Sequence, residues 1–333
     1  MIKTAIVGFG MSAKTFHIPF IKQSPDYELV AISTSHIAGA TVAFPRASVH
    51  ESALEMITST DADLIIITAP NDVHYNLAHA CLMANKHVVV EKPMGLTKES
   101  CERVIYTALQ MNRQVFCVMQ NRYSPPSEWI KSVVEDGILG NIFMVQVNCY
   151  WNRDERYYKQ GGWKGTSDLD GGTLFTQFSH FIDIMYWLFG DIDQIQGKFA
   201  DFNHKDSTDF EDSGFVSFKF LNGGMGCINY STAVANQNLE SSLTIIGSKG
   251  SVKIGGQYMN IVEHCNIKNY QMPILAETAA GNHYGAYTGS AQNHHLVIEN
   301  VMRVLNGGEN LGSTAEEGSK VVATINKMYD AGK

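Results

Sequence analysis

Short apolar runs alternate with helical patterns in the first third of the chain, and this alternation restricts the fold more than any other feature. The apolar runs cover residues 3–7, 28–32, 64–68, 87–91 and 115–119, and helical patterns at 13–23, 52–57, 74–84 and 98–111 separate them. Strands that are apolar on both faces must be covered on both faces, as in a parallel sheet flanked by helices. This segment therefore predicts an α/β fold with a doubly wound parallel sheet.

The first apolar run ends in a glycine turn, Gly8-Phe9-Gly10-Met11, and a small residue, Ala13, opens the next helical pattern. Gly8 permits a sharp turn, and Gly10 lets the backbone approach a phosphate closely. Free amides at a helix start also bind anions. A plain strand-to-helix corner is the alternative, but the alternating strands and helices favour a dinucleotide-binding Rossmann domain.

Polar residues follow the other expected strands, and open α/β sheets bind their ligands beyond the carboxyl ends of such strands. We expect these residues to bind the cofactor together with the glycine turn, and Lys92 to meet the substrate as well. They are Ser33, Thr34 and Ser35 after the second strand, Thr68, Ala69, Pro70, Asn71 and His74 after the third, Glu91 and Lys92 after the fourth, and Gln120 after the fifth. The second strand ends with neither the acid that holds an NAD ribose nor an arginine for the NADP phosphate, so the cofactor is NAD or NADP.

After residue 121 the pattern changes to one of mixed helices and strands. A helix is expected near 128–135, a long strand at 141–151 and a strong helix at 174–189, followed by strands with hairpin turns at 221–224 and 247–250. We expect a Rossmann domain at 1–121 and an α+β substrate domain at 122–333. Packing of the C-terminal helix back on the Rossmann domain stays open.

The expected helix at 174–189 carries a candidate acid–base group. Thr176, His180, Asp183 and Trp187 are spaced by four, three and four residues and would share one helical face. A histidine has an ordinary pKa of about 6.5, which suits proton transfer at neutral pH. A structural histidine is the alternative interpretation.

The segment 150–165 mixes cations with aromatic rings. Its cations are Arg153, Arg156, Lys159 and Lys164. Such a mixture binds phosphates by charge and sugar or base rings by stacking, although a surface or subunit-contact arm would look the same. We expect a substrate site made of Arg122, Tyr157, Trp163, Lys164 and Asp183.

Three motifs together resemble the Gfo/Idh/MocA family of NAD(P)-dependent sugar and inositol oxidoreductases, over nearly the whole chain. They are the G-x-G-x-x-A turn, the stretch Thr68-x-Pro70-Asn71-x-x-His74, and Glu91-Lys92-Pro93. The resemblance implies a second domain with a large, mostly antiparallel sheet and homodimers or homotetramers formed through that sheet. It also implies His180 as the acid–base residue and Lys92 as the group that orients and polarises the reacting oxygen, with the reverse assignment open.

The resemblance extends to one branch of the family and includes one departure. Tyr157-Tyr158, the run at 163–165 and the stretch at 171–180 resemble enzymes that oxidise the 3-hydroxyl of UDP-N-acetylhexosamine derivatives, including uronates. Many family members carry an aspartate where this chain has Thr176. We place Thr176 among the catalytic residues, but a threonine cannot serve as a general base.

The implied function is hydride transfer between NAD(P) and a secondary alcohol of a sugar or sugar derivative, and a nucleotide-linked N-acetyl sugar is one candidate. A redox-neutral NAD-dependent glycosidase and a non-catalytic cofactor-sensing regulator are the alternatives on the same fold. A pure interaction protein would not require the glycine turn, Lys92 and His180 together.

The composition of the chain restricts the kinds of binding partner and the cellular location that we expect. A net charge of -8 argues against nucleic acid and anionic membrane surfaces as partners. The six cysteines are scattered without zinc-ligand spacing, so we expect neither a disulfide framework nor a metal. No signal sequence precedes the first strand and no apolar run is long enough to span a membrane, so the expected location is the cytoplasm.

Overall fold

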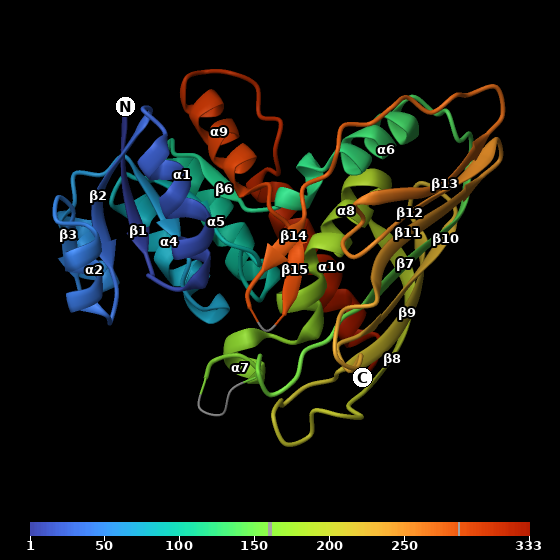
Figure 1. Ribbon diagram of the computed structural model, residues 1–333, viewed down its shortest axis with the longest axis horizontal. Helices are drawn as coiled ribbons and strands as arrows, with labels where there is room; N and C mark the ends of the chain where they lie inside the picture. Colours follow the sequence, from blue (N-terminus) through green and yellow to red (C-terminus); the bar gives the residue numbers. More distant parts are fainter. Residues whose placement is uncertain (159–161, 286) are drawn as a thin grey trace. The chain divides into compact units, whose positions relative to one another are not determined.

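The structure is a computed structural model that describes residues 1–158, 162–285 and 287–333 (Figure 1). The chain forms two compact units. The first contains Met1–Met119 and His294–Val322, and the second contains Gln120–Asn293 and Ala323–Lys333. None of the described helices combines the length and the apolar character needed to cross a membrane.

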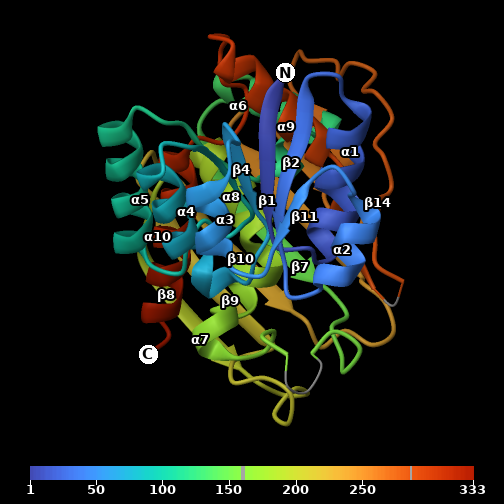
Figure 2. The same cartoon turned by 90° about the vertical axis from the view of Figure 1, so that its left-hand side faces the viewer.

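A parallel sheet of six strands forms the centre of the first unit, in the order β3-β2-β1-β4-β5-β6. Its strands are β1 (Ile2–Val7), β2 (Tyr27–Ser33), β3 (Ser48–His50), β4 (Leu64–Ile67), β5 (His87–Val90) and β6 (Val115–Cys117). Its helices are η1 (Ala13–His17), α1 (Ile18–Gln23), α2 (Ile37–Ala43), α3 (Ala53–Ser59), η2 (Asn71–Val73), α4 (His74–Met83), α5 (Lys98–Met111) and α9 (His294–Leu305). Figure 2 shows α1 and α2 on one side of the sheet and α3, α4 and α5 on the other, which confirms the doubly wound fold predicted from the sequence.

The central strands are buried because helices cover both faces. All four residues of β4 are buried, as the continuous apolar run predicts. The sequence did not reveal α2 and β3. These elements have only seven and three residues, which is too short for a clear periodic signal.

A sheet of seven strands dominates the second unit, in the order β13-β12-β11-β7-β10-β9-β8. Its strands are β7 (Ile142–Tyr150), β8 (Ile192–Ala200), β9 (Ser213–Phe220), β10 (Met225–Ser231), β11 (Glu240–Gly247), β12 (Gly250–Gly255) and β13 (Ile261–Ile267), and β14 (Gly281–His283) and β15 (Thr288–Ala291) form a separate pair. Neighbouring strands of the seven-stranded sheet pair antiparallel, except β7 and β10, which pair parallel. The predicted α+β domain with a mostly antiparallel sheet is confirmed.

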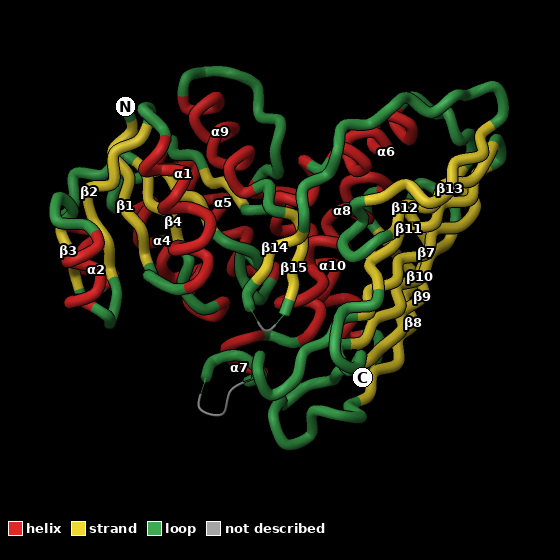
Figure 3. The backbone as a smooth tube through the Cα atoms, in the orientation of Figure 1, coloured by secondary structure: helices red, strands yellow, loops and turns green. Residues whose placement is uncertain are grey.

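Helices cover one face of this large sheet. The helical segments are η3 (Gln120–Tyr123), α6 (Pro125–Glu135), α7 (Ser167–Asp170), η4 (Leu174–Phe178) and α8 (Ser179–Phe189), while α10 (Ala315–Asp330) is divided between the two units. Figure 3 shows α6 and α8 along the covered face. In β9 the side chains of Val216, Phe218 and Phe220 point to this face and are buried, and the residues between them are exposed.

Two helices that contain or directly follow predicted site residues begin with a π turn. These turns are η1, which follows the glycine turn, and η4, which precedes His180. A π turn holds more residues than an α turn, and such turns are frequent at functional sites. The regular helix predicted for 174–189 is therefore wrong in its first turn, and the shared face derived from α-helical spacing does not apply to Thr176.

Candidate functional site

The glycine turn has the geometry that a dinucleotide needs. Gly8 has a φ of 93°, and a Cβ there would lie 2.9 Å from both the carbonyl and the hydroxyl oxygen of Thr68. The N–H of Gly8 donates to the carbonyl of Ser33 at 2.9 Å, which ties the turn to β2. A Cβ at Gly10 would meet no described atom within 4 Å. The turn is therefore restricted to glycine on one side and open on the other, where the phosphates of a dinucleotide fit.

His74 joins the ends of two strands. Its Nδ1 lies 2.6 Å from the carbonyl oxygen of Pro93, and its Nε2 lies 2.8 Å from that of Ala69. Burial lowers the pKa of His74, and the two carbonyls only partly offset this effect. A neutral ring donates to one of these carbonyls and a charged ring to both. His74 thus holds the segments that follow β4 and β5 together.

Glu91 ties the end of β5 to η1. Its carboxylate lies 2.7 Å from Nε2 of His17, and both side chains are buried. Burial alone would raise the pKa of Glu91, but the hydrogen bond and charge of His17 outweigh it and lower the pKa to about 2. Nearby, burial lowers the pKa of His294 to about 3, and its ring stacks on Phe16 with 3.9 Å between ring centres. Lys92 is half-buried directly after this anchored position.

The other predicted cofactor residues of the first unit line the same strand ends. Ser33, Thr34 and Asn71 are buried, Phe9, Thr68, Ala69 and Pro70 are half-buried, and Ser35 and Met11 are exposed. The hydroxyl of Thr68 donates to the carbonyls of Val7 and Gly8 at 3.0 and 3.2 Å. The N–H of Thr34 donates to the carbonyl of His50 at 2.9 Å, so the end of β2 is held by β3.

His180 lies buried near the start of α8, in the second unit. The side-chain nitrogen of Gln120 lies 3.3 Å from Nε2 of His180 and 3.3 Å from the hydroxyl oxygen of Ser290. Gln120, which we expected to bind the cofactor, thus contacts the candidate acid–base residue.

Thr176 is paired with a carboxylate that the sequence analysis did not single out. Its hydroxyl donates to Oδ1 of Asp170 and lies 3.2 Å from the Asp170 carbonyl. The other carboxylate oxygen of Asp170 accepts from the N–H of Gly165 at 2.8 Å. Asp170 is fully buried. A carboxylate is therefore present beside Thr176, although it comes from a residue six positions earlier.

Arg122 and Asp183, both expected in the substrate site, pair with each other. The guanidinium donates to the two carboxylate oxygens at 2.8 and 2.7 Å, and both side chains are buried. The guanidinium also lies 5.2 Å from the ring centre of Trp187. This bidentate ion pair holds η3 against α8.

Aromatic rings surround the buried guanidinium of Arg153. The guanidinium carbon of Arg153 lies 4.7, 5.2 and 4.9 Å from the ring centres of Trp151, Tyr157 and Tyr287. In the described part of the chain its donors go to neutral oxygen atoms, which belong to Gln177, Asn152, Asn238 and Thr288. Burial lowers the pKa of Arg153.

Lys164 lies at the edge of this ring cluster. Its Nζ is 3.9 Å from the ring centre of Tyr157 and 6.0 Å from that of Trp163. Lys164 also lines a cavity of about 590 Å³, together with Tyr158, His204 and their neighbours. Arg156 instead pairs with Asp154 near the surface, and Lys159 lies outside the described residues.

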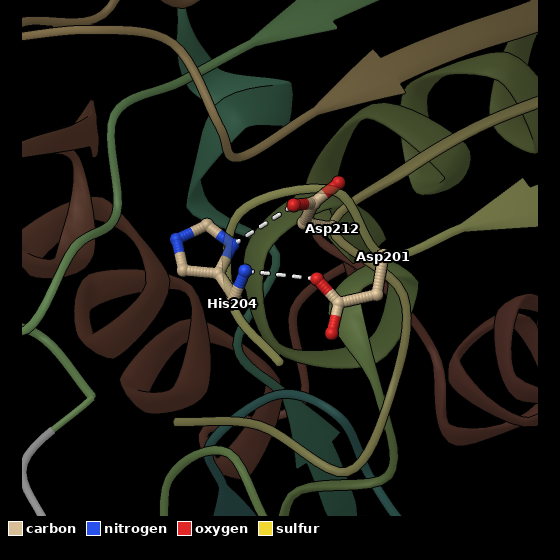
Figure 4. Close-up of side chains that lie close together, drawn as sticks. All are labelled: Asp201, His204 and Asp212. Atoms are coloured by element: carbon tan, nitrogen blue, oxygen red, sulfur yellow. Dashed lines mark hydrogen bonds and ion pairs between the residues drawn. The ribbon is translucent and has the colours of Figure 1, made fainter. Parts of the chain in front are cut away.

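One group of described residues has the composition of a metal site, namely Asp201, His204 and Asp212 (Figure 4). Nδ1 of His204 faces Oδ2 of Asp212 at 3.3 Å, and the N–H of His204 donates to Asp201 at 2.8 Å. The same Asp212 oxygen accepts from the N–H groups of Phe202 and Asn203 at 3.0 and 2.7 Å. These contacts close the loop between β8 and β9, and we assign no ion to them.

The structure thus adds Asp170, His17 and Ser290 to the candidate residues. Asp170 lies directly before the Gly171-Gly172 pair, and a search for acidic residues near His180 would have found it. His17 and Ser290 have no such local signal, since their partners lie 74 and 170 positions away.

Two family models match most of the chain. Residues 2–119 match the oxidoreductase family with an NAD-binding Rossmann fold, and residues 128–253 match the GFO/IDH/MocA C-terminal domain. The solved WlbA dehydrogenase from Bordetella pertussis, in complex with NADH and UDP-GlcNAcA, is 29% identical with a TM-score of 0.87, covering 99% of this chain and 96% of that one. Its counterpart from Chromobacterium violaceum, with the same ligands, is 30% identical with a TM-score of 0.86, covering 99% and 93%.

A curated relative is similar over a shorter stretch. The scyllo-inositol 2-dehydrogenase (NADP(+)) IolW from Bacillus subtilis is 35% identical over 191 residues, which are 57% of this chain and 52% of that protein. The chain thus spans about half the length of this relative. The two family matches lie one after the other along most of the chain, and the solved relatives match it almost from end to end. The protein belongs to the Gfo/Idh/MocA family of oxidoreductases, with an NAD-binding Rossmann domain at its start.

Proposed function

We propose that this protein is an NAD(P)-dependent dehydrogenase that oxidises a secondary alcohol of an acidic, nucleotide-linked N-acetyl sugar. The observation that carries the proposal is the buried His180, whose Nε2 lies 3.3 Å from the side-chain nitrogen of Gln120. Such a histidine, in a chain with a dinucleotide-binding turn, suits the oxidation of an alcohol.

His180 takes the proton of the substrate hydroxyl, and a bound NAD(P) would supply the hydride acceptor for the carbinol carbon. Lys92 orients and polarises the reacting oxygen. Thr176 does not act as the base, because a neutral hydroxyl is too weakly basic; its hydroxyl donates to Asp170. We assign cofactor binding to residues 1–121 and substrate binding to residues 122–333, with Tyr157, Trp163 and Lys164 as substrate ligands.

Two cations of the second unit, Arg153 and Lys164, support an anionic substrate. Arg153 is buried and pairs with neutral groups in the described part of the chain, and Lys164 lies beside the same rings. Two cations around Tyr157 and Tyr287 suit a carboxylate or a phosphate that brings negative charge. The WlbA relatives were solved with UDP-GlcNAcA, a ligand of that class.

We also propose a reducing compartment, the cytoplasm, as the protein's location. All six cysteines are free thiols, and four of them are buried. Structural disulfides are usual in oxidising compartments, whereas free thiols persist in reducing ones. A protein recovered from its native source with these cysteines oxidised would contradict this location.

The first test identifies the cofactor by mass spectrometry of the released nucleotide and then follows reduced-nicotinamide absorbance with candidate substrates. UDP-N-acetylhexosamine uronates, the corresponding neutral UDP-sugars, free hexoses and inositols form the panel. We expect absorbance to rise with the uronates. A response to inositols alone would contradict the substrate class, and glycoside cleavage without net NADH would favour the redox-neutral glycosidase.

The second test replaces the acid–base residue. His180→Ala should reduce kcat by roughly two to four orders of magnitude and leave cofactor affinity nearly unchanged. The matched control is His264→Ala, since His264 is exposed on β13 and takes no part in the proposed site. Near-normal turnover of His180→Ala would disprove the role of His180.

A further inference from the structure

The side-chain amide of Gln120 contacts two groups at once. Its nitrogen lies 3.3 Å from Nε2 of His180 and 3.3 Å from the hydroxyl oxygen of Ser290. All three side chains are buried. In the described part of the chain the amide oxygen of Gln120 accepts no hydrogen bond, although it is buried as well. A buried acceptor of this kind is costly and calls for an explanation.

The chemistry of an amide sets the state of the histidine. An amide nitrogen carries only donors, so Nε2 of His180 must be the acceptor in this arrangement. A neutral imidazole has one protonated and one unprotonated nitrogen. The proton of neutral His180 is therefore on Nδ1, and Nε2 is the nitrogen that can take a proton.

We infer that Gln120 is a positioning residue for His180, and that its amide turns over as His180 gains and loses a proton at Nε2. This inference rests on the proposed role of His180. With Nε2 unprotonated, the amide nitrogen faces the ring. When the substrate O–H bond breaks and its proton bonds to Nε2, the amide oxygen faces the ring and accepts from the new N–H; a bound NAD(P) would accept the hydride.

Ser290 can pair with the amide of Gln120 in both orientations. A hydroxyl both donates and accepts, so Ser290 accepts from the amide nitrogen in the first state and donates to the amide oxygen in the second. The oxygen that accepts nothing in the first state then accepts from two donors. The pair thus holds His180 in place in both protonation states.

Neighbouring bonds keep the three backbones fixed while the amide turns. Arg122, two residues after Gln120, bonds to Asp183 on α8. Asn121 accepts from the N–H of Ala291 at 3.3 Å, which holds β15 beside η3. The charged groups on the elements around His180 are the Arg122–Asp183 pair, Asp170 beside Thr176, and Arg153, which bonds to Gln177.

The direct test is ¹⁵N NMR of the imidazole of His180 in the full-length, cofactor-loaded protein, assigned by its disappearance in His180→Ala. We expect the neutral ring to show a protonated Nδ1 and an unprotonated Nε2. A neutral ring with its proton on Nε2 would overturn the inference. This measurement needs no turnover, so its failure is distinct from that of the proposed function, which rests on the kinetics of His180→Ala.

Variants test the effect on catalysis. The carboxylate of Gln120→Glu offers only acceptors and a negative charge, which favours the protonated ring. The variant should raise the pKa of His180 by about one unit or more and shift the low-pH limb of the kcat/KM profile to higher pH by the same amount. Gln120→Leu should lower kcat roughly tenfold with a smaller change in KM. Gln237→Leu is the matched control, because Gln237 is exposed in the loop before β11. An unchanged titration of His180 in Gln120→Glu would also overturn the inference.

Discussion

The two glycines of the turn, Gly8 and Gly10, have different roles: one serves the stability of the fold and the other the binding of the cofactor. Gly8 has a left-handed φ and lies against the backbone of Thr68, whereas the space beside Gly10 is open. The first glycine is thus required by the fold itself. The second is required only when a ligand approaches the turn.

A pair of alanine substitutions separates the two roles. Gly8→Ala should lower the free energy of unfolding by about 2–4 kcal/mol, because it combines an unfavourable φ with a backbone clash. Gly10→Ala should leave unfolding nearly unchanged and weaken cofactor binding roughly tenfold, since its methyl group occupies the open side. Urea unfolding measures the stability of each variant, and NADH fluorescence titration measures its cofactor affinity. Normal cofactor affinity of Gly10→Ala would exclude a phosphate at this position.

At the scale of elements, the start of the His180 helix is anchored by a buried acid. The carboxylate of Glu211 accepts from the hydroxyls of Tyr230 and Tyr329 at 2.8 Å each. The Tyr329 hydroxyl accepts in turn from the N–H of Leu174, in the first turn of η4, at 3.0 Å. Burial raises the pKa of Glu211 to about 7, although both tyrosine hydroxyls act in the opposite direction.

This raised pKa makes stability depend on pH. Between pH 4.5 and 7 the unfolded chain loses the proton of Glu211 while the folded chain keeps it, so stability falls as pH rises through this window. The full loss is roughly 3 kcal/mol. Glu211→Gln removes the titration and should remove this fall, as measured by urea unfolding across the window. An unchanged pH dependence in the variant would contradict the assignment.

Tyr329 transmits the anchor to the helix. Tyr329→Phe should lower the free energy of unfolding by about 1–3 kcal/mol, because it leaves the N–H of Leu174 and one oxygen of Glu211 without this partner. Tyr106→Phe is the matched control, since Tyr106 is exposed on α5. Equal stability of the two variants would show that the anchor contributes nothing.

At the scale of the whole molecule, the uncovered face of the large sheet points to self-association, which we propose as a homodimer or homotetramer. Met225, Met144 and Ile246 are neighbours across β10, β7 and β11, and they are 54%, 41% and 42% exposed. A row of exposed apolar side chains in the middle of a sheet is typical of an interface. A second copy offers a matching apolar row.

Sedimentation measures this prediction directly. The wild-type protein should sediment as a dimer or tetramer, and the double variant Met144→Asp, Ile246→Asp should sediment as a monomer, because buried carboxylates at an interface are costly. Leu109→Asp, at an exposed position of α5, is the control and should not change the mass. A monomeric wild-type protein would contradict the proposal.

The sequence by itself determined the elements whose signal is local. The parallel sheet followed from apolar runs, the hairpins from glycine turns, and the family from three short motifs, because backbone sterics and burial act over a few residues. The seven-residue α2, the three-residue β3 and the two π turns gave no such signal. The roles of Lys92, Thr176 and His180 stay predictions.

Only the tertiary structure decided which polar groups meet. Thr176 pairs with Asp170, Arg122 with Asp183, and Gln120 lies between His180 and Ser290. Each of these partners is one of many donors and acceptors that the composition allows. The choice depends on how η3, η4, α8 and β15 pack, since buried polar groups bond to whichever partners the packing of these elements brings within reach.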